Sequence, residues 1–420
     1  MKDSETKAVI EWLVDGARPA PDTQGVLAEL CERLLRCGIP LWRVGVFLLT
    51  LHPQIMGQRF LWKPGAAVDV NGAPFEAFQT DDFRNSPVRH AIDTGNVIRR
   101  RLRDEACPID FTMLGELRGQ GVTDYLAVPL YFADGVAHGA TFATQDDRGF
   151  DEMQIATLKS AAAPLARAVE NRSLRRTASA LLDAYVGNKG GARILAGQIR
   201  RGDVETINAA IWLSDLRGFT TLTERLAPQT LLDLLNRYFD CQVPSILERG
   251  GEVLKFVGDG LVAIFPIAAH NEDAAQICSN ALTAAREARA AVARLSRRLT
   301  ARGVLPSVSA TAAGPSPEPY AQGLRFGLAL HVGQVSYGNI GSGNRLDFTC
   351  IGPAMNFAAR LEGLTGKLRR TILASEEFAQ RCPAAFVPLG QFEFAGIAGT
   401  RAAFGLPDEL GQNGRQQLPA

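Results

Sequence analysis

The chain has 420 residues, of which 46% are hydrophobic, and its formal net charge is +1 at pH 7. This length favours two domains joined by a connector, and the composition is that of a globular protein. A net charge so close to zero provides no field that attracts nucleic acid or an acidic membrane surface, so we expect neither as a partner.

The sequence shows no signal for a membrane or for export. No apolar run reaches the roughly 18 residues of a membrane span, and the first residues lack the apolar core of a secretory signal. The seven cysteines form no C-x-x-C pair, which favours scattered thiols in a reducing compartment. We therefore expect a soluble cytoplasmic protein.

Residues 1–21 form an N-terminal segment, and residues 22–171 have the pattern of an α/β domain. Apolar spacing and turn residues predict, in order, a helix at 26–35, strands at 43–51 and 59–62, a helix capped by Ser86, an edge strand at 96–102, a helix at 110–120 and a hairpin at 125–132 and 137–144. The arginines at the edge strand could bind an anion or form a solvated surface, and charge runs usually do the second.

The order of these elements resembles that of GAF domains, a family of small-molecule-binding or dimerising sensors. The resemblance implies a sensory or regulatory domain over residues 22–171, with an unidentified small-molecule ligand. Cys107 could carry a chromophore, and His52, His90 or His138 could bind haem, but a single residue of these types is more often structural or exposed. The sequence therefore leaves the ligand open.

A long helix is predicted over residues 151–185, where two heptad-like seams follow each other: Leu158, Ala162, Leu165 and Val169, then Leu174, Ala178, Leu181 and Tyr185. We expect this helix to pair with its copy in a homodimer. The alternative is a helix packed on its own domain, and Pro164 favours that reading. Residues 172–206 form the helical linker to the next domain.

The second domain, residues 207–406, begins with a predicted strand at 209–213 that delivers Asp215 to the edge of a sheet. A helical segment follows, interrupted at Pro228. Runs at 253–257 and 261–265 then form a hairpin around Gly258, Asp259 and Gly260. Since the first strand of such a unit commonly lies beside the hairpin, Asp215 and Asp259 should converge, and paired carboxylates suit Mg²⁺ or Mn²⁺.

The remaining elements repeat this pattern. The sequence predicts a helix at 272–298, a disordered surface loop at 300–322, a hairpin of strands at 324–332 and 334–340 with Gly333 at its turn, a strand at 346–351, a helix at 355–364 and a tail at 407–420. Two such units imply a mostly antiparallel, ferredoxin-like βαββαβ sheet with helices on one face, and the chain as a whole belongs to the α+β class.

The segments SDLRGFT (214–220), KFVGDG (255–260) and DFTCIGPAMNFAARLE (347–362) resemble the catalytic domain of class III nucleotide cyclases. The resemblance implies that Asp215 and Asp259 hold two Mg²⁺ or Mn²⁺ ions, with Leu216 in the same metal site. These ions would activate the ribose 3′-hydroxyl and bind the triphosphate. Phe219 and Thr220 are implied as further substrate-binding residues.

The resemblance also implies a homodimer in which each site is shared between subunits. Asn356 and Arg360 would orient the ribose and stabilise charge on the phosphates. Lys255 and Thr349 would read the purine edge, and these residue types favour ATP over GTP. Many relatives also have a lysine near the C-terminal strand; here Arg401 or Lys367 would replace it.

The leading interpretation is an adenylate cyclase that makes 3′,5′-cyclic AMP and is regulated by its N-terminal domain. The alternatives are a guanylate cyclase and a non-catalytic dimeric sensor. A diguanylate-synthesising enzyme is disfavoured, because its Gly-Gly-acid signature occupies a hairpin turn, whereas Gly250, Gly251 and Glu252 precede a predicted strand.

Overall fold

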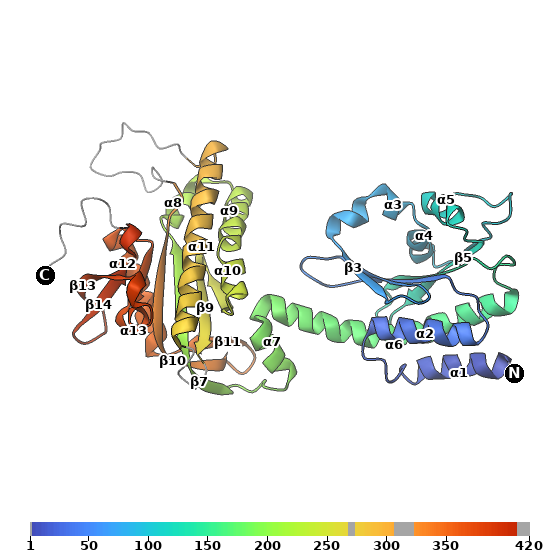
Figure 1. The fold of residues 1–420 in the computed structure, drawn as a ribbon, viewed down its shortest axis with the longest axis horizontal. Helices are drawn as coiled ribbons and strands as arrows, with labels where there is room; N and C mark the ends of the chain where they lie inside the picture. The colour runs from blue at the N-terminus through green and yellow to red at the C-terminus, as the bar shows by residue number, and fades with distance from the viewer. Residues whose placement is uncertain (1, 268–273, 306–322, 410–420) are drawn as a thin grey trace. The chain divides into compact units, whose positions relative to one another are not determined.

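A computed structural model describes residues 2–267, 274–305 and 323–409. The chain divides into two compact units, Met1–Ala184 and Tyr185–Ala420 (Figure 1). Most of the predicted loop at 300–322 and of the predicted tail at 407–420 lies outside the described residues. None of the described helices is both long and apolar enough to span a bilayer.

The first unit contains a six-stranded antiparallel sheet in the order β3-β2-β1-β6-β5-β4. Its strands are β1 (Arg43–Leu49), β2 (Gly57–Trp62), β3 (Asp69–Ala73), β4 (Ile98–Arg100), β5 (Asp124–Tyr131) and β6 (Ala137–Thr144). β3 was not predicted, because its residues are mostly exposed and form no apolar run. The other strands lie within the predicted segments or extend them by one or two residues.

Helices cover both faces of this sheet (Figure 1). On one face lie α1 (Lys2–Val14), α2 (Thr23–Arg36) and the first half of α6 (Glu152–Val186). On the other lie η1 (Phe75–Gln79), α3 (Asp81–Arg84), α4 (Pro87–Thr94) and α5 (Thr112–Gly119). Val9 and Leu13 of α1 are buried in the first core, so the N-terminal segment packs as part of this unit.

The two seams of α6 have different environments. Leu158, Leu165 and Val169 of the first seam are fully buried in the core of the first unit. In the second seam, Leu174 is 62% and Tyr185 is 80% exposed. The helix continues through Pro164 as one element of 35 residues. The first seam therefore packs on its own unit, and only the second leaves apolar side chains exposed.

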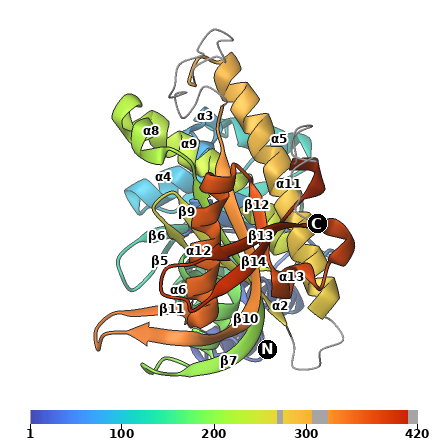
Figure 2. The ribbon, with the colours of Figure 1, turned by 90° about the vertical axis from the view of Figure 1, so that its left-hand side faces the viewer.

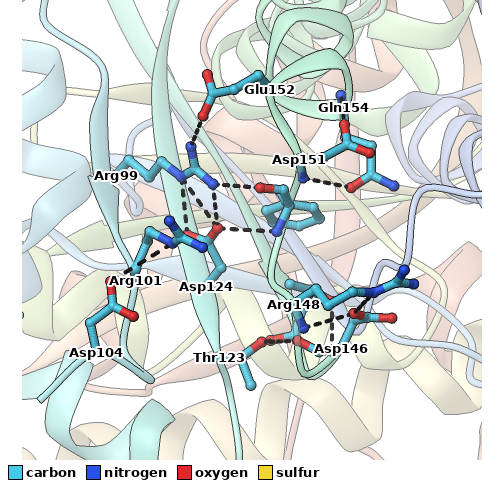
Figure 3. A network of polar contacts seen from close by, with 12 residues as sticks. Arg99, Arg101, Asp104, Thr123, Asp124, Asp146, Arg148, Asp151, Glu152 and Gln154 are labelled. Atoms are coloured by element: carbon cyan, nitrogen blue, oxygen red, sulfur yellow. Dashed lines mark hydrogen bonds and ion pairs between the residues drawn. The ribbon is translucent and has the colours of Figure 1, made fainter.

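The arginines at β4 form ion pairs within the first unit (Figure 3). The Nη2 atom of Arg99 lies 2.8 Å from Oδ2 of the fully buried Asp124, and its Nη1 atom lies 2.8 Å from Oε1 of Glu152, at the start of α6. Arg100 pairs with Asp110. Neither predicted role, an anion site or a solvated surface, describes Arg99. A buried carboxylate requires a paired cation, and Arg99 supplies it.

The second unit contains an eight-stranded sheet in the order β13-β14-β12-β10-β7-β9-β8, with β11 paired to β10. Its strands are β7 (Val204–Leu216), β8 (Glu252–Val257), β9 (Gly260–Ile267), β10 (Phe326–Gly341), β11 (Leu346–Ile351), β12 (Ile372–Ser375), β13 (Val387–Glu393) and β14 (Thr400–Gly405). The antiparallel strands β10-β7-β9-β8 form the predicted ferredoxin-like core. Figure 2 shows β7, β10 and β11 together at one end of this unit.

Helices cover both faces of this sheet, so the prediction of helices on one face is wrong. One face carries α8 (Phe219–Arg225), α9 (Pro228–Asp240), α10 (Val243–Glu248), α11 (Ala274–Ala301) and α13 (Glu376–Ala379); the other carries α7 (Asn188–Leu195) and α12 (Pro353–Leu368). The reason lies in β7, where Ala210 and Trp212 are buried on one face and Ala209 and Ile211 on the other.

The predicted hairpin at Gly333 is also wrong, because β10 runs through this residue without a break. Gly333 pairs with Ala209 in the ladder between β7 and β10. A Cβ atom at Gly333 would lie 2.6 Å from Cβ of Ala354 in α12. This glycine therefore allows α12 to approach the sheet closely, and its function is packing rather than a turn.

Candidate active site

Asp215 and Asp259 lie close together, as predicted. Asp215 is near the end of β7, Asp259 occupies the turn between β8 and β9, and β7 and β9 are adjacent strands in which Ser214 pairs with Leu261. A Cβ atom on Gly260 would lie 3.3 Å from Oδ1 of Asp215. Burial and the neighbouring charge of Asp215 raise the pKa of Asp259 to about 6.

The chemistry of this pair fits a divalent cation. Two carboxylates held side by side repel each other unless a cation or a proton lies between them, and hard oxygen ligands suit Mg²⁺ and Mn²⁺. No group of three or more His, Cys, Asp or Glu side chains with metal-binding geometry occurs in the described ranges. Further ligands would therefore be backbone oxygens such as that of Leu216, phosphate oxygens of a substrate, or water.

A partly buried ion pair lies at the end of β7, close to Asp215 in the sequence. The Nη2 atom of Arg217 is 2.5 Å from Oε1 and 2.9 Å from the carbonyl oxygen of Glu362, and it also donates to Oγ1 of Thr365. Burial raises the pKa of Glu362 to about 7, while the charge of Arg217 acts in the opposite direction. A Cβ atom at Gly327 would overlap all three side chains, so the packing there requires glycine.

Glu362 was not among the predicted site residues. Its signal is its spacing, because Ala354, Ala358 and Leu361 are buried positions of α12, and Glu362 lies on the same side of the helix. An acidic residue on the apolar side of a helix requires a buried partner.

Lys255 and Thr349 lie on β8 and β11. Nζ of Lys255 is 3.9 Å from Oδ2 of Asp347, which precedes Thr349 by two residues and therefore shares its face of β11. Thr349 is 5% exposed, and its Oγ1 atom has no hydrogen-bond partner in the described part of the chain. An unpaired buried hydroxyl is suited to bind a ligand.

The other predicted residues lie on the helices α8 and α12. Asn356 and Arg360 are exposed on α12, and neither side chain forms a hydrogen bond or an ion pair within the described residues. Phe219 packs against the core at the start of α8, and Thr220 beside it is exposed. Among the described residues, no hydrogen bond or ion pair connects these four residues to Asp215 or Asp259. Their roles therefore remain predictions.

The two candidates to replace the missing lysine lie on different elements. Lys367 is in the last turn of α12, and Arg401 is in β14 opposite Phe392. Both remain candidates.

The second unit is similar in sequence to known cyclases. Residues 204–396 match the family model of the adenylate and guanylate cyclase catalytic domain. The chain is 31% identical over 194 residues to an adenylate cyclase of Anabaena cylindrica, which covers 45% of this chain and 34% of that protein. It is also 31% identical over 180 residues to the terminal-differentiation specific adenylate cyclase of Dictyostelium discoideum, covering 42% of this chain and 7% of that protein.

The chain thus spans about a third or less of the length of these two curated relatives. Among solved structures, the adenylyl cyclase CyaB from P. aeruginosa is 25% identical, with a TM-score of 0.39, over 48% of this chain and 95% of that one. Residues 204–396 are therefore similar to the adenylate and guanylate cyclase catalytic domain.

Proposed function

We propose that this chain is an adenylate cyclase that converts ATP to 3′,5′-cyclic AMP and pyrophosphate in a homodimer with two shared sites. The observation that carries the proposal is the convergence of Asp215 and Asp259 at the end of β7. The adenylate cyclases among the relatives support ATP as the substrate.

In the proposed reaction, the ribose 3′-oxygen attacks the α-phosphorus of ATP, the bond to the bridging oxygen breaks and pyrophosphate leaves. The proton of the 3′-hydroxyl passes to solvent. Asp215, Asp259 and Leu216 would hold Mg²⁺ or Mn²⁺, which supplies acidification of the hydroxyl and neutralisation of phosphate charge. Arg360 would bind the α-phosphate with a fixed cationic fork, and Asn356 would hold a ribose oxygen.

The unpartnered hydroxyl of Thr349 supports the assignment of the base-reading residues. It can accept from the exocyclic amine of adenine, and Lys255 can donate to a ring nitrogen. The ion pair with Asp347 would orient Lys255 toward β11. Guanine presents the opposite pattern of donor and acceptor at this edge, so Lys255 and Thr349 together disfavour GTP.

The first unit would be a GAF-like sensory domain that regulates the reaction. Its support is the continuity of α6, which begins beside the sheet of the first unit and ends at Val186 in the second unit. The exposed second seam of α6 supports a homodimer, because Leu174 and Tyr185 would be buried against the same residues of a second copy.

The test is to incubate the purified full chain with Mn²⁺ and either ATP or GTP and to identify the product by mass. Cyclic AMP from ATP, lost in Asp259→Asn, is the expected result. Cyclic GMP alone would favour the guanylate cyclase alternative. Neither product, from protein that still binds Mn²⁺, would favour the non-catalytic sensor.

A further inference from the structure

A cavity of about 340 Å³ lies on the sheet of the first unit, on the face covered by η1, α3 and α4. Its walls are mostly apolar, and the residues that matter here are Phe47 and Leu49 of β1, Arg59 of β2, and Phe78, Phe83 and Ile92 above them. Phe47 and Leu49 alternate with Val46 and Leu48, which are buried on the opposite face. The size is in the range of small-molecule sites.

Arg59 is the one charged side chain among the residues lining this cavity. Its Nη2 atom lies 3.0 Å from Oδ2 of Asp69, but its Nε atom is buried and has no hydrogen-bond partner in the described chain. A buried donor without an acceptor is costly, and native proteins rarely leave one unless a ligand or water completes it. The Nε atom therefore indicates a place for an acceptor.

A second guanidinium adds to the positive charge near Arg59. Arg43 lies on the same face of β1 as Phe47, and it forms no ion pair with any described residue. Burial lowers the pKa of Arg43 most, and the nearby charge of Arg59 lowers it further, while Tyr125 and Glu116 act in the opposite direction. Arg59, whose side chain is 41% exposed, is therefore the cation at the edge of this apolar cavity, and the more buried Arg43 lies near it.

We propose that this cavity binds a small monocarboxylic acid, whose apolar body lies against Phe47, Phe78 and Ile92 and whose carboxylate accepts hydrogen bonds from Arg59. An apolar lining with one cationic group fits such an acid better than a nucleotide, whose base and phosphates require many polar partners. Such an acid would be the ligand of the proposed sensory domain. Its effect on catalysis rests on the proposed function, but its binding does not, since binding does not require catalysis.

The test uses the full chain and a matched pair of probes, octanoate and its neutral analogue octanamide, with binding measured by calorimetry. Octanoate should bind at least about tenfold more tightly, because the carboxylate forms charge-assisted hydrogen bonds that the amide cannot replace. Arg59→Gln should remove this preference, while Arg148→Gln, at a 93% exposed arginine of the same unit, should not change it. Equal binding of the two probes, or no binding of either, would overturn the proposal.

Two further variants separate the specific site from loss of folding. Asp69→Asn removes the carboxylate that competes for Arg59, so octanoate should bind several-fold more tightly while octanamide is unaffected. Ala77→Phe fills the cavity and should abolish binding of both probes without lowering the melting temperature. An unchanged octanoate affinity in Asp69→Asn would contradict the role of Arg59. Because none of these measurements uses ATP, an inactive catalytic domain would leave the binding result readable.

Discussion

Arg217, two residues after Asp215, and Glu362, in the helix that carries Arg360, form an ion pair of 2.5 Å. Glu362 also has the raised pKa of a buried carboxyl, so the pair is held in a poorly solvated place. In the proposed homodimer, Asp215 and Arg360 of one subunit serve different sites. The pair therefore connects the elements on which both sites depend.

Removing one partner of this pair should destabilise the second unit. Arg217→Leu leaves Glu362 without a buried cation, and we expect a loss of about 3–5 kcal/mol in the free energy of unfolding at pH 8. Urea denaturation followed by circular dichroism would measure it. The double variant Arg217→Leu with Glu362→Leu should recover most of the loss, because no buried charge remains. A double variant no more stable than Arg217→Leu would show that the charge is not the cause.

The raised pKa of Glu362 predicts a dependence of stability on pH. The folded pKa is about 7 against an ordinary value of 4.5, so the folded state holds this proton more tightly than the unfolded state. Its contribution is fully present below pH 4.5 and is lost as the pH rises through 7, by roughly 3 kcal/mol. Glu362→Gln should flatten this part of the curve in metal-free protein. An identical curve for the variant would contradict the assignment.

Shared sites predict that two inactive variants restore each other. Asp259→Asn and Arg360→Ala should each reduce cyclic AMP formation by at least about a hundredfold. After subunit exchange, half of the dimers are mixed, and each has one intact site, so activity should return to about a quarter of the wild-type value. A mixture of Asn356→Ala with Arg360→Ala is the control, because it cannot form an intact site. No recovery in the first mixture would place each site within one subunit.

The choice of base should follow the residues on β8 and β11. Lys255→Glu with Thr349→Cys presents the opposite pattern of donor and acceptor, so the ratio of kcat/KM for GTP to that for ATP should rise at least about tenfold. Steady-state kinetics with both nucleotides would measure the ratio. Lys159→Glu, at an exposed lysine of the first unit, is a charge-matched control that should leave the ratio unchanged. A ratio unaffected by the double variant would refute the base assignment.

In the first unit, two neighbouring arginines should differ sharply in importance. Arg99→Ala leaves the fully buried Asp124 without its cation and should cost about 3–5 kcal/mol of unfolding free energy. Arg101→Ala removes an ion pair whose side chains are 55% and 58% exposed, and it should cost less than about 1 kcal/mol. Thermal denaturation of both variants would compare them. Equal losses would mean that the network in Figure 3 is not a stabilising feature.

Local chemistry was sufficient to predict the positions of Asp215 and Asp259. Asp215 follows an apolar strand, and Asp259 lies between two glycines in a hairpin turn, so the neighbouring residues alone specify both conformations. The start of α9 at Pro228 was predicted for the same reason, because proline suits a first helical turn. Each of these features depends on a few consecutive residues.

Tertiary packing decided the features that the sequence left open or that were predicted wrongly from it. Gly333 has the appearance of a turn residue, but the approach of α12 determines its role in a continuous strand. Arg217 and Glu362 are 145 residues apart, and only the folded sheet brings them together in a poorly solvated place. The sequence alone therefore determined the positions of Asp215 and Asp259 and most of the helices and strands, since these follow from local propensity. Ion pairs, cavities and close contacts depend on residues distant in the chain, and only the folded structure decided them.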